Sequence, residues 1–347
     1  MAKVNVEDLG YNQIPHYCTH AIDSFAELAE ILPQKLAIPA DFELFLCDMM
    51  RASVKFLLPD NGYLFAEHDF RPTMFDLLRL PYPACALEFT ATPELYAAHS
   101  GLAYSAKRIA LCFDPRQLPP VQLARLSRLC GKPFLDNVPE RCLAVMAVYE
   151  ANGIWNAAVG VVLIDLDEDK PMPLKGEVPE ELRVIAERVG ERLQSKKTAH
   201  GLPATFIAFP ARSRIVGQTA EEATEALYID TIDEVRTAYE FLAAINCSNV
   251  GTQDVPAPKL LNDRRKKKGR ALFYPYKVLD LSSSAPDERG EGVGTHASPR
   301  THLRRGHIRQ LGERFGYKVL WINATMVNAK TGAEAVATVY KVKASGR

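Results

Sequence analysis

Histidine and arginine side chains gather in one short segment near the end of this 347-residue chain. Three of its eight histidines and four arginines fall within the fourteen residues from His296 to Arg309. Arginine binds phosphate oxygens in a bidentate manner, and its positive field keeps a neighbouring histidine neutral and able to act as a base. Residues of these types at this density are suited to binding phosphate or to phosphate chemistry.

The spacing within this segment decides which side chains share a face. Alternate residues of a strand project to the same side, so Arg300, His302 and Arg304 lie together if the segment is a strand. Strict alternation would place His307 and the arginine two residues later on the opposite side. A bulge at Arg305-Gly306 would return both to the face of His302, since interior glycines favour bulges. We therefore expect one face with two imidazoles and three guanidiniums.

Three functions fit such a face. In the first, the arginines bind the backbone of a nucleic acid and no reaction takes place. In the second, a metal-independent ribonuclease uses His302 and His307 for acid–base catalysis and Arg304 to stabilise the developing charge. In the third, the cluster is a polar network that orders the sheet. The chain has no glycine-rich phosphate loop and no metal-ligand motif, so we expect neither a cofactor nor a metal.

A second basic segment, Arg264–Arg270, holds six positive charges in seven residues. Phe273, Tyr274 and Tyr276 follow it, and cations beside aromatic rings suit single-stranded nucleic acid through phosphate contact and base stacking. A solvated linker is the alternative. The residues expected to bind nucleic acid in the two segments are Arg264, Arg265, Lys266, Lys267, Lys268, Arg270, Arg300, Arg304, Arg305 and Arg309.

The net charge of the chain is zero, but the charge is unevenly distributed. Residues 1–250 hold 23 Lys and Arg against 34 Asp and Glu, whereas residues 251–347 hold 19 against 8. A basic end of this kind favours a polyanionic partner. The acidic and basic parts could instead pack on each other. The acidic body could also contact a protein, so a protein-interaction factor that acts on a host enzyme is the remaining alternative.

Helix and strand patterns alternate over the first 250 residues, which predicts an α+β fold. The turn Glu150–Gly153 joins strands expected over residues 142–149 and 154–165, and so short a connection makes the two strands antiparallel. Asp41 precedes an apolar stripe with helical spacing and is expected to cap that helix. These elements predict an acidic body over residues 1–215, built on a mixed or antiparallel sheet.

Residues 216–347 form the second predicted unit, which is basic. Capping boxes at Thr219–Glu222 and Thr231–Glu234 are expected to begin helices, and residues 251–270 to form an extended linker. Four strand patterns then lie at residues 271–281, 300–311, 317–327 and 335–342. Their connections predict a helix followed by a four-stranded antiparallel sheet. The Ser-, Gly- and Pro-rich tract 282–299 is expected to be a flexible loop beside the histidine cluster.

The cysteines and the overall hydropathy indicate the compartment. The seven cysteines have no regular spacing and lie mostly among apolar neighbours, which is typical of reduced core thiols in a cytosol. No apolar run approaches the roughly 20 residues that cross a bilayer, and the first residues lack the order of a signal peptide. We expect a cytoplasmic protein that contacts no membrane.

The tract HASPRTHLRRGHIRQL, followed by Val319–Thr325 with its Trp321, resembles an uncharacterised family of proteins from tailed bacteriophages and prophages. The segments Leu78–Phe89 and Ile245–Val250 fit the same family. The resemblance covers most of the chain. It implies a phage gene that is expressed in the bacterial cytoplasm, and it brings no activity with it.

Overall fold

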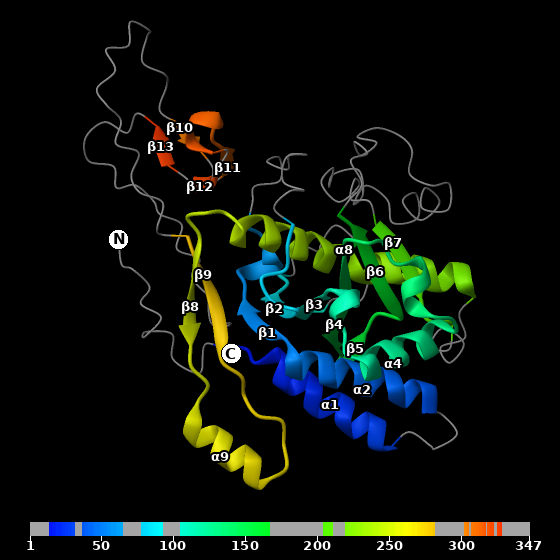
Figure 1. Ribbon diagram of the computed structural model, residues 1–347. Helices are drawn as coiled ribbons and strands as arrows, with labels where there is room; N and C mark the ends of the chain where they lie inside the picture. The colour runs from blue at the N-terminus through cyan, green and yellow to red at the C-terminus, as the bar shows by residue number, and fades with distance from the viewer. Residues whose placement is uncertain are drawn as a thin grey trace, which may run out of the picture.

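A computed structural model describes the protein at residues 14–31, 37–64, 78–92, 105–166, 204–210, 219–281, 302–304, 307–316, 318–322 and 325–327. Within these residues a nine-stranded mixed sheet forms the centre, in the order β7-β6-β4-β3-β2-β1-β9-β8 with β5 beside β4 (Figure 1). The strands are β1 (Val54–Leu57), β2 (Ala84–Thr90), β3 (Lys107–Phe113), β4 (Cys142–Ala151), β5 (Ile154–Ala157), β6 (Gly160–Asp165), β7 (Ala204–Ala208), β8 (Gly251–Val255) and β9 (Tyr276–Asp280). The expected α+β class with a mixed sheet is confirmed.

Helices cover both faces of the sheet, with α1, α2 and α4 on one face and α8 on the other (Figure 1). Their bounds are α1 (Tyr17–Ile31), α2 (Ala37–Ala52), α4 (Pro120–Cys130) and α8 (Ala220–Ile245). Successive residues of a strand point to opposite faces, so each strand contributes to two cores. In β2, Ala84 and Ala86 join the core under α1 and α2, whereas Cys85 and Leu87 join the core under α8. No helix among the described residues is both long and apolar enough to cross a membrane.

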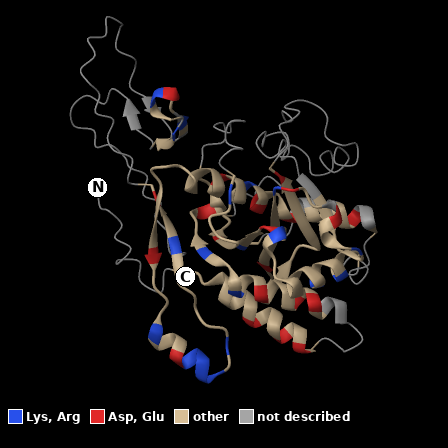
Figure 2. Ribbon diagram, in the orientation of Figure 1, with Lys and Arg blue, Asp and Glu red and all other residues tan. Residues whose placement is uncertain are grey.

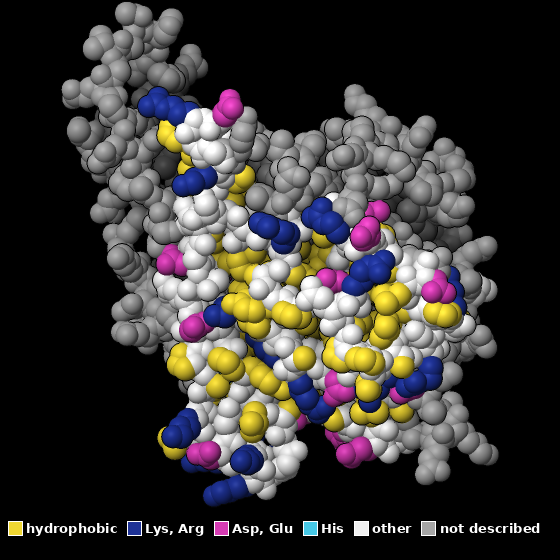
Figure 3. All heavy atoms as spheres, in the orientation of Figure 1, with side chains coloured by type: hydrophobic (Ala, Val, Ile, Leu, Met, Phe, Trp, Pro, Cys, Tyr) yellow, Lys and Arg dark blue, Asp and Glu magenta, His cyan; other side chains and the backbone are white. Residues whose placement is uncertain are grey.

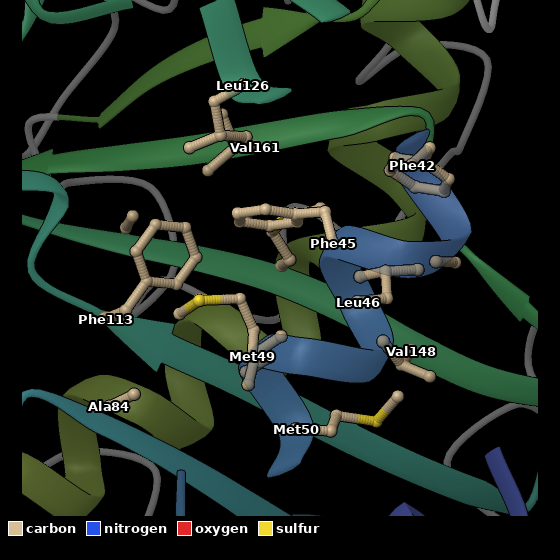
Figure 4. Packing of buried hydrophobic residues seen from close by; sticks show 14 of the residues in the cluster. Phe42, Phe45, Leu46, Met49, Met50, Ala84, Phe113, Leu126, Val148 and Val161 are labelled. Carbon is tan, nitrogen blue, oxygen red and sulfur yellow. The ribbon is translucent and has the colours of Figure 1, made fainter. Parts of the chain in front are cut away.

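Large apolar side chains of α2 fill the first of these cores. Figure 4 shows Phe45 and Met49 directed at the sheet, and the rings of Phe45 and Phe113 lie 6.0 Å apart. All seven cysteines are buried and free, as expected for reduced core thiols. Burial raises the pKa of Cys85 to about 12, which keeps this thiol protonated and unreactive.

Strand β9 lies inside the main sheet and not in a separate C-terminal sheet. It runs parallel to β1 and antiparallel to the edge strand β8. The buried hydroxyl of Tyr276 in β9 finds its hydrogen-bond partner, Glu88, in β2. Helix α8 packs on β3, β4, β6 and β7. Helix α8 and strand β9 were expected to belong to a unit after residue 216. Instead β9 is part of the main sheet, and α8 packs on that sheet and forms a core with it.

The second expected capping box does not begin a helix, because α8 is continuous through it. The first box is present: the N–H of Glu222 donates to the Thr219 hydroxyl at 3.2 Å, and the N–H of Thr219 donates to the Glu222 carboxylate at 2.8 Å. At the second, Thr231 donates to a backbone carbonyl one turn earlier and Glu234 binds Arg108. Both side chains are engaged elsewhere, so the helix propagates.

Two other boundaries differ from the expectation. Helix α2 begins at Ala37, so Asp41 lies inside it, where its carboxylate accepts hydrogen bonds from Arg128 at 2.8 and 3.0 Å. The segment 154–165 divides into β5 and β6, because β5 pairs with the second half of β4 and β6 with the first half.

The expected basic linker is largely ordered into β8 and a helix, α9 (Lys259–Lys267). Leu, Lys and Arg have high helix propensity, but a dense run of cations is also typical of a solvated linker, which is why the helix was not predicted. The remaining strands are β10 (His302–Arg304), β11 (His307–Gln310), β12 (Val319–Ile322) and β13 (Thr325–Val327). They pair antiparallel, β10 with β13 and β11 with β12. The strand expected at residues 335–342 and the loop expected at 282–299 lie outside the described residues.

Candidate nucleic-acid interface

The basic segment at residues 264–270 forms the second half of α9 and the turn after it. Five of its six cations are exposed, and we call them the α9 cations: Arg264, Lys266, Lys267, Lys268 and Arg270. Asp263 is the only acidic residue of this helix. Figure 2 shows basic residues along the second half of α9, and Figure 3 shows Lys and Arg side chains on the lobe that this helix forms. Because like charges at this density repel one another, this surface favours an anionic partner.

Arg265, the sixth cation, points back to the body and anchors α9. Its guanidinium binds the carboxylate of Asp23 on α1 and the carbonyl of Ala271. It also stacks over Phe273, with 4.5 Å between the guanidinium carbon and the ring centre. The second carboxylate oxygen of Asp23 accepts the N–H of Ala271 at 2.9 Å. The charge of Arg265 is thus neutralised within the protein, so we exclude this residue from the interface.

The return segment, residues 270–275, links α9 to β9 and is tied to both helices beside it. The side-chain amide of Asn262 donates to the carbonyl of Phe273 and accepts its N–H, each at 2.8 Å. The hydroxyl of Thr19 on α1 donates to the carbonyl of Leu272 at 3.0 Å. Hydrogen bonds from side chains to this segment, together with the Arg265–Asp23 pair, therefore position the α9 cations relative to α1.

Replacing Asp23 with Ala is expected to loosen α9 without unfolding the body. The change removes the acceptor of both Arg265 and the Ala271 N–H, at a cost of about 1–3 kcal/mol confined to this region. Amide hydrogen exchange within residues 259–275 should accelerate roughly tenfold or more, while amides of β3 and β4 keep their protection. Glu27→Ala, one turn along the same helix, is the control and should leave the exchange unchanged. Equal protection in the two variants would contradict the anchoring role of Asp23.

Two histidines beside the return segment add no positive charge at neutral pH. The ring of His16 lies 4.5 Å from that of Phe273 and 5.4 Å from that of Tyr276, between ring centres. Burial, reinforced by His20 and Arg265, lowers the pKa of His16 to about 4. Burial and then the charge of Arg265 lower the pKa of His20. The positive charge of the interface therefore comes from lysine and arginine.

A groove of about 910 Å³ opens beside the turn that follows α9. Residues of α1, of the β4–β5 hairpin and of the turn after α9 line it. The lining residues that matter most here are His20, Glu27, Lys107, Trp155, Lys268 and Arg270. The groove thus carries cations, aromatic rings and four carboxylates, those of Asp23, Glu27, Glu30 and Glu150, and two of the α9 cations belong to it.

The histidine-bearing strands form an antiparallel hairpin. His302 pairs with Val327 and His307 with Ile322, so both strands advance by five residues between the two pairs. The position expected for the bulge, Arg305-Gly306, lies outside the described residues. A common face for the two histidines stays a prediction.

The hairpin is fixed to the end of α8. Trp321 is buried in the core under α8. The side chain of Asn249 donates to the carbonyl of Trp321 at 2.8 Å and accepts its N–H at 2.7 Å. Arg309 is exposed, whereas Arg300 and Arg305 lie outside the described residues. The predicted catalytic roles in this hairpin stay predictions.

The two basic segments lie at opposite ends of the β8–β9 ribbon (Figure 1). The hairpin contacts the chain just before β8, where the N–H of Ser248 donates to the carbonyl of Val319 at 2.9 Å. Helix α9 follows the other end of β8. Five residues of antiparallel strand span roughly 14 Å from first to last. Arg309 and the α9 cations are therefore separate surfaces and not one patch.

Two buried polar clusters were not anticipated from the sequence. Glu88 of β2 accepts the N–H groups of the first two residues of α1 at 2.8 Å each, and the hydroxyl of Tyr276 at 2.6 Å. Arg108 of β3 binds both carboxylate oxygens of Glu234 on α8, at 2.5 and 2.9 Å. The available signal was a charged residue in an otherwise apolar strand, Glu88 in ACALEFT and Arg108 in KRIALCF.

Sequence similarity connects the chain to one protein family. No curated protein and no solved structure matches it. The AcrVA2-like model, described as the anti-CRISPR type V subtype A2 family, matches residues 72–329, about three quarters of the chain. The match extends from before β2 to beyond β13 and includes α9 and the hairpin. It agrees with the expected phage-associated family and does not bear on the C-terminal motif. The chain belongs to the AcrVA2-like anti-CRISPR family.

Proposed function

We propose that this protein acts against a type V CRISPR system in the cytoplasm of a bacterial host, during infection by a tailed phage, and that it binds nucleic acid through the α9 cations. The family membership supports the first part. The observation that carries the second is the cluster of five exposed cations on α9 and its turn. An RNA-guided system contains nucleic acid, which is a polyanion that the α9 cations can bind.

The positive charge of α9 distinguishes between a nucleic-acid target and a protein target. RNA-guided effectors of the kind best understood hold their nucleic acid in a positively charged channel. A cationic helix is repelled by such a channel and attracted to the RNA or DNA that occupies it. The α9 cations therefore favour nucleic acid over the channel itself.

Direct contact with a protein of the host's CRISPR system is the second candidate function. Exposed carboxylates on α1, among them Glu27 and Glu30, favour it, and Figure 2 shows acidic residues along α1 away from α9. An acidic surface is complementary to a positively charged channel. The two contacts are compatible, since α1 and α9 present opposite charges.

Salt dependence tests the binding of nucleic acid. Five phosphate contacts give a slope of log affinity against log salt of roughly −3.5 on a single strand and −4.5 on a duplex. Neutralising the five α9 cations with Gln should remove most of this slope and weaken binding roughly 10- to 100-fold at low salt. Fluorescence anisotropy with a labelled RNA measures both quantities. The control exchanges exposed cations elsewhere, Arg79→Gln and Lys132→Gln, and should keep the slope of the wild type.

Other outcomes of this titration assign the function elsewhere. Binding that ignores salt, or no binding at low salt, would contradict the proposal and favour the protein target. RNA that is cleaved with EDTA present, and left intact by His302→Ala, would instead support the ribonuclease alternative. Purification without nuclease treatment provides a first check, since bound RNA or DNA should co-elute with the wild type and be lost from the five-cation variant.

A further inference from the structure

The α9 cations continue into the groove and do not end at the outer surface of the helix. Lys268 and Arg270 line the groove beside Gly269, whose φ of +65° turns the chain at this point. Lys107 of β3 also lines the groove, where it is paired with Glu150. A nucleic-acid strand whose phosphates bind the α9 cations in succession would therefore reach the groove.

We infer that this groove takes the unpaired end of a nucleic-acid strand, with a phosphate at Lys268 and Arg270 and a base against α1 and Trp155. The inference rests on the proposed binding of nucleic acid. Its test compares RNAs with and without unpaired ends, and this comparison can contradict the inference while the α9 cations still bind RNA.

The mixture of charges favours an unpaired nucleotide over a duplex. A duplex presents phosphates at its surface, so a carboxylate in the binding site would repel it. An unpaired base also presents amino groups, and carboxylates accept hydrogen bonds from them. Asp23 is engaged with Arg265 and the return segment, whereas Glu27, one turn further along α1, is exposed and lines the groove. Glu150 also lines the groove but is paired with Lys107, and Glu30 lies a further turn along α1. Glu27 is therefore the exposed carboxylate nearest to Asp23 along α1, and we expect it to bind a base.

The aromatic part of the groove is rigid. Trp155 is 7% exposed and Tyr17 is 8% exposed, and their ring centres lie 5.9 Å apart. The hydroxyl of Tyr17 is hydrogen-bonded to Thr90 at 2.9 Å. Only a small part of each ring reaches the groove, so the pair provides an ordered wall for a base and not a free face for stacking. A contact surface that is already ordered costs little conformational entropy on binding. The volume is in the range of pockets that hold small ligands, so it can hold a nucleotide but not a double helix.

The test compares three RNAs of one sequence: a single strand, a blunt duplex and a duplex with a short single-stranded overhang. A DNA single strand of the same sequence shows whether the sugar matters. The single strand and the overhang should bind the wild type at least roughly fivefold more tightly than the blunt duplex does. Glu27→Ala should remove this preference by weakening only the two RNAs with unpaired ends, because a lost base contact changes affinity by that factor or more.

The control variant should change the RNA affinity in the opposite direction. Asp263→Ala removes an exposed carboxylate from α9, outside the groove, and should strengthen binding of all three RNAs by a small factor. If Glu27→Ala also strengthens the single strand, Glu27 only repels phosphate and the inference is wrong, although the five-cation variant would still lose affinity for every RNA. Cytidine monophosphate should displace the single strand from the wild type and not the blunt duplex. A groove that takes a protein segment instead would show no such displacement, which would also overturn the inference.

Discussion

Removing the Glu234 side chain is expected to destabilise the protein by about 3–5 kcal/mol, because Glu234→Ala leaves Arg108 as a buried, uncompensated charge. The side chains of Glu234 and Arg108 are 0% and 7% exposed. Arg108 also donates to the carbonyl of Asp230 at 3.0 Å, and the carboxylate of Asp230 accepts the hydroxyl of Tyr149 at 3.1 Å. These contacts join β3 and β4 to α8, so the loss affects the packing of the whole second core.

Urea unfolding of three variants tests whether the loss comes from the orphaned charge. The double variant Arg108→Met, Glu234→Leu removes both charges and should recover most of the loss, since apolar replacement of a buried pair is often close to neutral. Lys107→Ala is the matched control on the neighbouring residue. Lys107 pairs with Glu150 at the surface, so its removal should cost less than about 1 kcal/mol. A double variant as unstable as Glu234→Ala would show that shape, and not charge, sets the stability at this site.

Replacing Glu88 with Ala is expected to cost about 4 kcal/mol, since three buried donors lose their acceptor at roughly 1–2 kcal/mol each. These donors come from α1 and from Tyr276 of β9, so Glu88 joins the first helix to the last strand of the main sheet. Glu88→Gln keeps one carbonyl oxygen and should cost less than half as much. Urea midpoints at one pH give both values, and an equal loss in the two variants would contradict the hydrogen-bond account.

The effect of pH on Glu88 has a definite sign. Burial raises the pKa of Glu88, against the hydrogen bonds from Tyr276 and from the N-terminus of α1, which lower it. The native state therefore binds this proton more tightly than the unfolded chain. The resulting contribution to stability is complete below the unfolded pKa of about 4.3 and is lost as the pH rises through the native value. The advantage of the wild type over Glu88→Gln should shrink by about 1.4 kcal/mol per pH unit within that window. An advantage that grows with pH would contradict the raised pKa.

The periodic parts of the fold could be predicted from the sequence, and the long-range pairings could not. The strand expected at residues 84–90 is β2, and β4 begins at Cys142 as expected. Both segments are apolar and bounded by turn-forming residues, Pro83 before β2 and Asn152-Gly153 after β4, so local signals suffice. The place of β9 depends on the contact between Tyr276 and Glu88, which are 188 residues apart. No local pattern encodes a contact of that kind, and β9 was therefore assigned to the wrong sheet.

The candidate site, too, could be predicted from the sequence only in part. The run of cations at residues 264–270 was visible in the sequence, and the exposure of five of them follows from their charge. Arg265 looks like its neighbours in the sequence, and only the position of Asp23 on α1 distinguishes it. The groove was hidden because α1, β3, the β4–β5 hairpin and the turn after α9 all contribute to it. The separation of the hairpin from α9 likewise depends on the ribbon between them.

The parallel pairing of β1 with β9 has a consequence for synthesis on the ribosome. Lys55 of β1 lies opposite Tyr276 of β9, so about 220 residues must be translated between the two partners. At roughly 5–20 residues per second, β1 waits about 10–40 s before its neighbour emerges. During that time Val54–Leu57 is the outer strand of a partial sheet, and an uncovered apolar edge invites pairing with other chains. Closing so long a loop costs about 5 kcal/mol of chain entropy, so the final docking of β9 should be a late and slow step of folding.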